Sequence, residues 1–464
     1  MRNSLRPVNR LPREVLASCA TFVSDSDPRP IVSLTHVCRY WRRSICSSPR
    51  NWASIATVWK QLVPLCLERA GAVPLAVDII VPEVKGDIGF LSALIPHVER
   101  VAHLSFTGHS SIDTVANDLP GFFASPMPNL TSLALRQAQE PAELFPADGS
   151  PMPPIFQSVS KLKSLRLTQT PIYPPLFNIP FLVELKMIGY TSPFNFGTFV
   201  GFLASNNDLE IVVLDIKFIE GSVWTVPARM VPLARLRHLS ITCANPIDAK
   251  GLLSCISLRS GIRLEVFCSH WSSLDSYLPS PPAPVQKVLA PITVVKFQNS
   301  PREFHVFGKN GSFSFRCSRI AFWIPELHLF PTTSVREFHV NNTPWTLTPV
   351  FLVSTLCRLP ALETLVITDT ASWATGTFES LAGQPLSCPS LKTIAFFNCV
   401  LTPEVTTEFE SVVARRKGLE AAWLYRVVIV SSTGVLPSHT VIQRLRQHVP
   451  YVDVRVDDKL PDLP

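Results

Sequence analysis

Two short pairs of residues combine side chains that could do nucleophilic chemistry: Cys38 with His36, and Cys268 with His270. A histidine beside a cysteine can take the thiol proton and leave a reactive thiolate. The sequence lacks the phosphate loops, nucleotide-binding fingerprints, nucleophile elbows and zinc-protease motifs of common enzyme classes. We therefore expect both pairs to be packing or surface residues, and the chain not to be an enzyme. A hydrolase is the distant alternative, and it would need Cys, His and Asp brought together in one pocket.

Cysteine is frequent in this chain but is not arranged for metal binding or for disulfides. The eleven cysteines are odd in number, no two form a C-x-x-C pair, and no set of Cys and His has the spacing of a zinc site. We expect them to be small buried apolar residues in a reducing compartment. The sequence predicts neither a metal nor a cofactor.

The formal charge of +7 is concentrated at the amino-terminal end. Residues 1–60 contain ten Lys or Arg side chains against three acidic ones, and the rest of the chain carries equal numbers of each sign. Nucleic-acid binding would need a basic stripe along the larger part of the chain, so we expect no nucleic-acid partner. A basic head instead favours an acidic protein partner.

The chain has no sequence signal for a membrane. No stretch approaches the run of about eighteen apolar residues that a spanning helix needs, and the first thirty residues lack the apolar core of a secretory signal. We expect a soluble intracellular protein in the cytoplasm, the nucleus or both, without a membrane partner.

The elements that would position any site begin with a helical head between Leu11 and Trp52. Its first helix is predicted by Pro12 at a tolerant first-turn position, followed by apolar residues at helical spacing: Val15, Leu16, Cys19, Phe22 and Val23. After a polar break, a second helical face is formed by Ile31, Leu34, Cys38, Trp41 and Ile45, and Pro49 ends it. Trp52 is placed either to close a small three-helix core or to anchor a partner.

Three segments of this head resemble the F-box family: Leu11–Leu16 (LPREVL), Leu34–Arg43 (LTHVCRYWRR) and Pro49–Trp52 (PRNW). They match the family's L-P-x-E-[IV]-L opening, its V-C-[RK]-x-W-[RK] middle and its P-x-x-W close. The segment Leu62–Ile80 is similar to the join between F-box and repeats in large fungal families of this kind.

The resemblance implies a head that binds a Skp-type adaptor of a cullin-RING ubiquitin ligase. Such adaptors are acidic, which agrees with the basic head. Carried over by motif position, the leading adaptor contacts would be Leu11, Pro12, Val15 and Leu16, and the residues that support the core or contact the partner would be Val37, Trp41 and Trp52. The alternative is that all of these apolar residues fill a three-helix bundle, because helix faces and interfaces use the same residue types.

Beyond residue 75 the apolar pattern L-x-x-L-x-L keeps returning. It starts at Val101, Leu130, Leu162, Leu182, Leu209, Leu236, Val335, Leu362, Leu391 and, weakly, at Leu419 with Ala422 and Leu424. A spacing of 20 to 32 residues, interrupted by one gap of 99, is the signature of leucine-rich repeats. Alternating apolar positions predict parallel strands, which bury that face only when a neighbour stacks beside them.

Each strand is expected to be followed by a helix or a turn. The sequence marks helix starts at Thr402–Glu404, at Ser438 and at Thr348–Pro349, which leads through Phe351, Leu352 and Leu356. The Asn or Cys usual after the third apolar position occurs only at Cys399, so we expect irregular curvature. Alternating strands and helices predict an α/β fold: a three-helix F-box followed by an irregular leucine-rich-repeat solenoid, a horseshoe with a parallel sheet.

The predicted domains follow from these boundaries. We assign residues 1–60 to the F-box-like head, 61–100 to a linker and first capping repeat, 101–456 to the repeat array and 457–464 to a flexible tail. An irregular insert is expected at about 275–334, with strands at 292–297, 303–307 and 312–317 and a hairpin turn at Gly308–Gly311. The last strand is predicted at Tyr451–Val456.

Residues that alternate with the core positions of a strand line the concave side of a horseshoe. We expect that side to bind a protein substrate through Arg136, Arg166, Lys186, His238 and His339, and through an aromatic patch of Phe397, Trp423 and Tyr425. The alternative for the three aromatic residues is that the terminal repeat folds them beneath its own last helix.

These observations predict a substrate-recruiting subunit of a ubiquitin ligase. The head would bind the adaptor, which binds the cullin scaffold, and the repeats would hold a protein substrate whose identity the sequence does not give. The alternative from another class is an interaction scaffold, whose F-box-like head either binds an adaptor without degradation or merely caps the first strand.

Overall fold

The structure is a computed structural model that describes residues 11–24, 29–81, 90–108, 122, 125–137, 160–169, 179–189, 196–215, 230–243, 245–268, 274–279, 285, 289–299, 302–308, 311–317, 327–341, 355–369, 378, 381, 388–418, 423–431 and 437–456. It divides the chain into two compact units, Met1–Thr225 and Val226–Pro464. No helix among these residues is long and apolar enough to cross a membrane.

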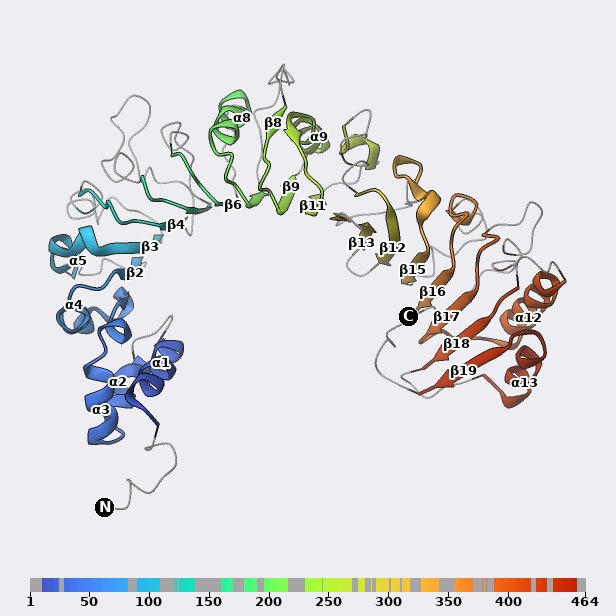
Figure 1. Ribbon diagram of the computed structural model, residues 1–464, viewed down its shortest axis with the longest axis horizontal. Coiled ribbons are helices and arrows are strands. Elements are labelled where there is room, and N and C mark those ends of the chain that lie inside the picture. The colour runs from blue at the N-terminus through green and yellow to red at the C-terminus, as the bar shows by residue number, and fades with distance from the viewer. Residues whose placement is uncertain are drawn as a thin grey trace. The chain divides into compact units, whose positions relative to one another are not determined.

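Unit 1 begins with three short helices and continues into a parallel sheet (Figure 1). Its helices are α1 (Arg13–Ser24), α2 (Arg29–Thr35), α3 (Arg39–Cys46), η3 (Pro49–Trp52), η4 (Thr57–Leu62), α4 (Val63–Ala70), α5 (Phe90–Leu94), η5 (Ile95–Arg100) and α8 (Phe196–Ser205). Its strands are β1 (Ser54–Ala56), β2 (Leu75–Val81), β3 (Val101–Gly108), β4 (Ser132–Gln137), β5 (Ser164–Thr168), β6 (Glu184–Ile188) and β7 (Ile211–Asp215).

Helices α1, α2 and α3 pack together, and a buried core joins them to the 3₁₀ helix η3. The Trp52 side chain is only 1% exposed, and its indole N–H donates to the Ile45 carbonyl over 3.2 Å. Thr21 on α1 donates to the buried Asn51 Oδ1 over 2.9 Å. Because these polar groups are satisfied inside the bundle, the head has a fixed core of its own.

The predicted helix through Ile31 and Ile45 is wrong in its middle, because the structure breaks it into α2 and α3. Cys38 is extended (φ −162°, ψ 170°) and precedes the first residue of α3. The Arg42 Nε donates to the Thr35 carbonyl over 3.0 Å. That carbonyl would have accepted a backbone N–H in a continuous helix, so the guanidinium satisfies it at the break instead.

Each strand of the unit 1 sheet pairs in parallel with the next strand along the chain, from β1 to β7. Leu104 lies beside Leu133, and Leu133 lies beside Leu165. Figure 1 shows α5 and α8 on one side of these strands, so the register places the leucines in a continuous core between sheet and helices.

The predicted core positions are confirmed. The three apolar residues of each repeat set from Val101 to Leu391 are at most 3% exposed, and they lie in both units. Burial of such side chains contributes roughly 1.5–3 kcal/mol each relative to exposure. The repeat pattern therefore identifies a buried face on each strand that carries it.

Unit 2 contains strands β8 (Val231–Pro232), β9 (His238–Cys243), β10 (Ile256–Ser257), β11 (Ile262–Cys268), β12 (Ile292–Asn299), β13 (Arg302–Gly308), β14 (Gly311–Cys317), β15 (Glu337–Asn341), β16 (Thr364–Thr368), β17 (Thr393–Phe397), β18 (Arg426–Val430) and β19 (Tyr451–Arg455). Its helices are α9 (Pro246–Cys255), η8 (Leu274–Ser276), η9 (Leu327–Leu329), η10 (Thr332–Ser334), α12 (Pro403–Lys417) and α13 (His439–His448). Strands β8 and β10 pair in a small separate sheet.

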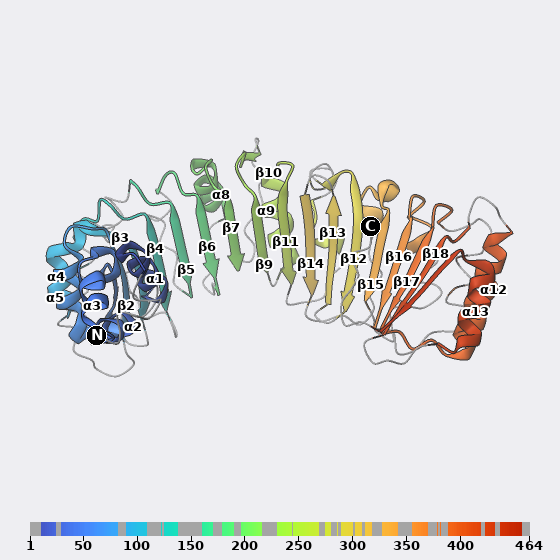
Figure 2. The ribbon, with the colours of Figure 1, turned by 60° about the horizontal axis from the view of Figure 1, so that its bottom comes forward.

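The inserted hairpin is confirmed, and it changes the order of the strands in unit 2. Strand β9 pairs with β11, and β11 pairs with β14. Strand β13 runs antiparallel between β14 and β12, and β12 pairs in parallel with β15. Figure 2 shows this order, β11, β14, β13, β12, β15, within unit 2. The chain therefore skips two strand positions after β11 and returns to fill them. Strands β15 to β19 then follow in chain order, all parallel.

Two of the predicted helix starts are confirmed. The Thr402 hydroxyl accepts from the Val405 N–H at the start of α12, and the Ser438 hydroxyl accepts from the Val441 N–H at the start of α13. The helix predicted from Thr348 falls mostly outside the described residues. The last strand lies at Tyr451–Arg455, one residue shorter than predicted.

The last predicted repeat set is placed too early. Strand β18 comprises Arg426–Val430, so its core positions are Val427 and Ile429 after Leu424. Val427 lies beside Ile394 of β17. Leu419 and Ala422 are outside the described residues. A longer loop than usual separates β17 from β18 because α12 spans 15 residues.

The Arg416 side chain on α12 is fully buried, which is unusual for arginine. Its Nη1 donates to the Leu381 carbonyl over 2.6 Å, and its Nη2 donates to the Cys388 carbonyl over 3.0 Å. Burial lowers the pKa of this guanidinium from its ordinary value. Arg416 therefore fixes α12 to the chain that precedes β17.

We predict that Arg416→Met destabilises the protein by about 2–4 kcal/mol, because two buried carbonyls lose their charged donor. Urea unfolding followed by circular dichroism measures this change. The matched control is Arg415→Met, because Arg415 is exposed one residue earlier on the same helix. Its expected effect is within about 0.5 kcal/mol. Equal effects of the two substitutions would contradict a structural role for Arg416.

Candidate binding site

The open face of a sheet is defined here by the side chains that alternate with its buried core positions. In unit 2 this face carries Arg263, Glu265 and Phe267 on β11, and His305 and Phe307 on β13. Strand β14 lies between them with two serines. Ser312 is beside Arg263 and Phe307, and Ser314 is beside Glu265 and His305.

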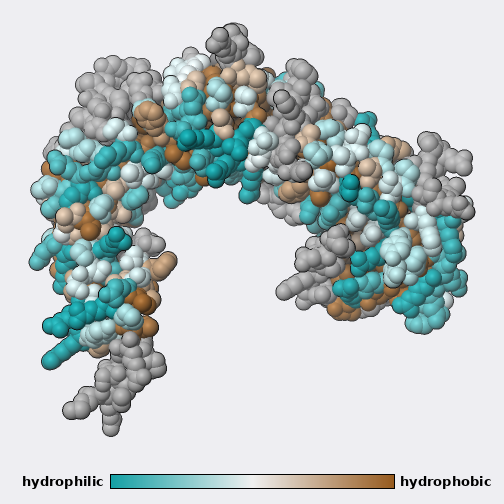
Figure 3. Space-filling view, in the orientation of Figure 1, coloured by the Kyte–Doolittle hydropathy of each residue, from teal (hydrophilic) through white to brown (hydrophobic). Residues whose placement is uncertain are grey.

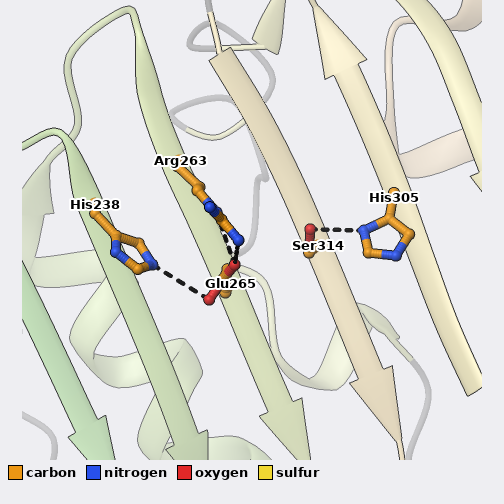
Figure 4. A network of polar contacts seen from close by, with 5 residues as sticks. All are labelled: His238, Arg263, Glu265, His305 and Ser314. Atoms are coloured by element: carbon orange, nitrogen blue, oxygen red, sulfur yellow. Dashed lines mark hydrogen bonds and ion pairs between the residues drawn. The ribbon is translucent and has the colours of Figure 1, made fainter. Parts of the chain in front are cut away.

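Glu265 is the acidic centre of a polar network on this face (Figure 4). Its Oε1 accepts from the Arg263 Nε over 2.8 Å and lies 2.6 Å from Nη2, and its Oε2 lies 3.2 Å from the His238 Nε2. Burial by itself raises the pKa of Glu265, but the hydrogen bonds and charges of His238 and Arg263 together lower it below the ordinary value. The carboxylate is therefore ionised and already paired at neutral pH.

His305 faces the same network from the other side of β14. Its Nδ1 lies 2.7 Å from the Ser314 hydroxyl, and its ring stacks on Phe307 with centroids 6.1 Å apart. Burial lowers the pKa of His305; the Glu265 charge raises it, and the charges of Lys296 and Arg263 lower it further. We therefore expect a neutral imidazole at neutral pH, which gains a positive charge on acidification.

These side chains line a hollow of about 420 Å³ on the open face of unit 2. Its walls include Phe267 and Phe307, and Phe307 is 36% exposed. The Lys296 ammonium lies 5.7 Å from the centre of the Phe307 ring. Aromatic walls with a few placed polar groups are typical of a binding site. Among the described residues, no group of three His, Cys, Asp or Glu side chains is arranged as metal ligands.

The predicted binding residues lie in different surroundings. His238 belongs to the Glu265 network, and His339 pairs with Glu337 on the same strand, β15. In unit 1, Arg136 and Arg166 are exposed on the open face, but Lys186 pairs with Glu184. Ser164 also donates to Glu184 over 2.7 Å. The pKa of Glu184 is lowered, because these hydrogen bonds and the charges of Lys186 and Arg166 outweigh the opposing effect of burial.

The predicted aromatic patch is wrong at Phe397, which is 4% exposed. Phe397 belongs to a buried apolar cluster formed by the side chains of β16 to β18 that alternate with the repeat core positions: Val366, Ala395, Phe397, Val428 and Val430. In these three strands the side predicted to be concave and open is therefore apolar and buried.

Trp423 and Tyr425 are exposed, at 45% and 52%. They precede β18 instead of alternating within it. Trp423 donates from its indole N–H to the carbonyl of His448, the last residue of α13, over 2.9 Å. Tyr425 contacts Tyr451 with ring centroids 4.8 Å apart. The indole thus bonds to the end of the last helix, while both rings keep exposed edges.

The predicted adaptor contacts on the head differ in their exposure to solvent. Leu16 and Trp52 are buried in the head's own core, Leu11 and Trp41 are half-buried, and the exposed ones are Pro12, Val15 and Val37. Leu16 and Trp52 are therefore core residues, which is the alternative that the sequence left open.

Helix α1 has an exposed apolar face that extends the predicted contact at Val15 along the helix. Val15, Cys19 and Phe22 follow at helical spacing and are all exposed, with Phe22 at 83%. The sequence placed them, with Leu16 and Val23, on a single apolar face of this helix and assigned Val15 to adaptor contact. Among the described side chains of α1, Leu16 and Ala20 alone form the buried face, so the predicted apolar face divides between core and surface. Figure 3 shows hydrophobic residues gathered over α1.

Three buried thiols of the described residues are shifted away from activation. Burial raises the pKa of Cys66 and of Cys255 to about 11, and that of Cys388 to about 12. A raised pKa opposes thiolate formation and thus nucleophilic chemistry. Cys268 is buried, and His270 is outside the described residues. Cys38 is half-buried beside the exposed His36.

Sequence reasoning missed β11, which contributes Arg263, Glu265 and Phe267 to the hollow. Its core residues Leu264 and Val266 lie beside Leu239 and Ile241 of β9. The first position of the L-x-x-L-x-L pattern is Gly261, so the template fails there. The alternation from Ile262 to Cys268, found 25 residues after the previous repeat, is the signal that would have identified the strand.

No protein-family model matches the chain, and no curated protein matches it. Among solved structures, the chain is similar to a leucine-rich-repeat protein of Leptospira interrogans. The two are 11% identical, with a TM-score of 0.33, and the match covers 86% of this chain and 98% of the other.

We predict that Glu265→Gln reduces the acid sensitivity of the fold. Because the folded pKa of Glu265 is depressed, its stabilisation is present above the unfolded pKa of about 4.3 and is lost as pH falls through the folded value. At pH 7 the substitution should cost about 1 kcal/mol. Urea unfolding between pH 7 and 3.5 measures both effects.

The control is Glu363→Gln, because Glu363 is more exposed and its partners Arg336 and Lys392 are 3.8 and 3.7 Å away. Its effect at pH 7 should stay within about 0.5 kcal/mol. Identical pH profiles for wild type and Glu265→Gln would refute the role given to this carboxylate.

Proposed function

We propose that this chain is a non-catalytic recognition subunit of a Skp/cullin/F-box-type ubiquitin ligase. Its head binds an acidic Skp-type adaptor, and its sheet holds a protein substrate for modification by the other subunits. The single observation that carries this proposal is the exposed apolar face of α1 on a folded, basic head.

The energetic argument concerns Phe22 and Val15. Both are large apolar side chains exposed to water on a helix that already buries Leu16 and Ala20 in its core. Contiguous exposed apolar residues with polar surroundings are typical of protein interfaces. A hollow of about 660 Å³ beside α1, lined by Phe22 and by Ser44, Ser47 and Ser48 among others, adds a recess for a partner side chain.

Charge supports an acidic partner. Arg39, Arg42 and Arg43 on α3 are exposed, and so is Arg50 on η3. Such side chains accelerate association with an acidic surface and favour it over other partners. The F-box-like motifs of this segment name the partner class, and the exposed apolar face supplies the contact surface.

The sheet supports the second half of the proposal. Its open face in unit 2 carries a hollow with aromatic walls and polar groups, and described cysteines with raised pKa values offer no activated nucleophile. This combination favours recognition of a protein without chemistry on it.

We predict that Val15→Asp combined with Phe22→Asp weakens adaptor binding more than tenfold, because two desolvated apolar contacts are replaced by charges that an acidic partner repels. Capture of a purified Skp-type adaptor on the immobilised full chain measures it. The control is Val400→Asp, because Val400 is similarly exposed but lies in unit 2. Unchanged adaptor capture by the double variant would overturn the proposed docking face.

Co-purification of the cullin distinguishes a ligase subunit from the alternative, a non-degradative scaffold. A ligase subunit should co-purify with adaptor and cullin in equal amounts from cells, and both should be lost in the double variant. Adaptor without cullin would favour a non-degradative scaffold.

A further inference from the structure

The hollow of unit 2 has the form of a furrow along β14. Within residues 311–315 of β14, the part whose side chains the structure describes, Ser312 and Ser314 occupy the open face, and longer side chains stand on both flanking strands, β11 and β13. Neighbouring strands are about 4.8 Å apart, so the flanking strands are roughly 10 Å apart. That width accommodates one extended polypeptide segment, and the serine hydroxyls form its floor.

Of the two charged residues that line the furrow, Arg263 is the more exposed and Glu265 is nearly buried. Glu265 is its acidic wall residue, and its oxygens are already paired with Arg263 and His238. Arg263 is 65% exposed, and Glu265 engages only its Nε and Nη2. Lys296 lies on β12, beside His305 of β13. The acidic residue that its charge affects on the far side is Glu337 on β15, which pairs with His339.

His305 on β13 lies between β12, which carries Lys296, and β11, which carries Arg263. Burial lowers the pKa of His305 most, the Glu265 charge raises it, and the charges of Lys296 and Arg263 lower it further. A negative group in the furrow would be attracted by Arg263 and Lys296 at neutral pH and by protonated His305 at lower pH. Phe267 and Phe307 offer apolar contact beside it.

We propose that this furrow binds one extended segment of the substrate protein, with an Asp or Glu side chain between Arg263 and Lys296 and an apolar neighbour against Phe267 or Phe307. This inference rests on the proposed function and gives it a substrate class: acidic and apolar residues adjacent in an unstructured segment. These contacts come from β11, β12 and β13, so the bound segment runs along β14, between β11 and β13.

The test is selection of a random twelve-residue peptide display library on the immobilised full chain. The expected result is enrichment of peptides with Asp or Glu one or two positions from an aromatic or aliphatic residue. Dissociation constants of the best peptide are then measured by fluorescence anisotropy. Binding should weaken at least tenfold when its acid becomes Gln, and also in the Arg263→Gln, Lys296→Gln double variant.

Two further variants distinguish loss of the furrow from loss of the fold. Ser314→Phe should fill the furrow and abolish binding. Arg336→Gln should change binding less than twofold, because Arg336 is an exposed cation that pairs with Glu363 near the start of β15. Each variant is compared with wild type by thermal melting before binding is measured.

The pH dependence supplies a signature that a nonspecific charge effect would not give. Wild-type binding should tighten about threefold or more from pH 7.5 to 6.0, because a bound carboxylate favours protonated His305. His305→Gln should remove most of this tightening. The other groups facing His305 are Glu265 and Arg263 on β11, Lys296 on β12 and Ser314 on β14.

Several outcomes would overturn the inference. They are a library without acidic enrichment, peptides that bind the Ser314→Phe variant equally, or affinity unchanged in the double variant. If a phosphoserine peptide bound more than tenfold tighter than its Glu counterpart, the group that the furrow recognises would be a phosphate and not a carboxylate. Adaptor capture is measured on the same preparation, so loss of the ligase role and loss of the furrow are distinguished.

Discussion

The whole structure depends on one constraint: a parallel strand has an apolar face and two hydrogen-bonding edges that it cannot satisfy alone. In unit 1, Leu104, Leu133 and Leu165 meet this constraint by aligning in register across β3, β4 and β5. Leu365 and Ile394 do the same in unit 2. Each strand covers the apolar face and the hydrogen-bonding edge of its neighbour, so the stability of the sheet grows with each strand added. A few apolar positions in each repeat are enough to specify this stacking.

This constraint fixes one face of each strand and leaves the other free to vary. In unit 1 the free face carries Arg166, Glu184 and Lys186, and the carboxylate of Glu184 pairs with Lys186. In β16 to β18 the same face is apolar and buried, as Phe397 shows. Between them along the chain, β13 interrupts the parallel order and brings His305 opposite Glu265 across β14. The candidate site therefore lies where the repeat is least regular.

The head follows a different constraint, because it is too small to bury all of its apolar side chains. Trp52, Leu16 and Asn51 complete a core whose polar groups are hydrogen-bonded. Phe22 and Val15 remain outside it. Exposed apolar surface on a fixed scaffold costs little conformational entropy when a partner covers it, which suits a docking element.

The sequence by itself determined the core positions, the helix starts at Thr402 and Ser438 and the inserted hairpin, because periodicity and capping are local properties. It did not decide which apolar residues of α1 are buried, since Val15 and Leu16 are both apolar and only packing against α2 and α3 separates them. Only the tertiary structure placed β14 beside β11, because strand order depends on pairing between distant segments. That pairing brought His305 to the Glu265 network, and no local pattern encodes it.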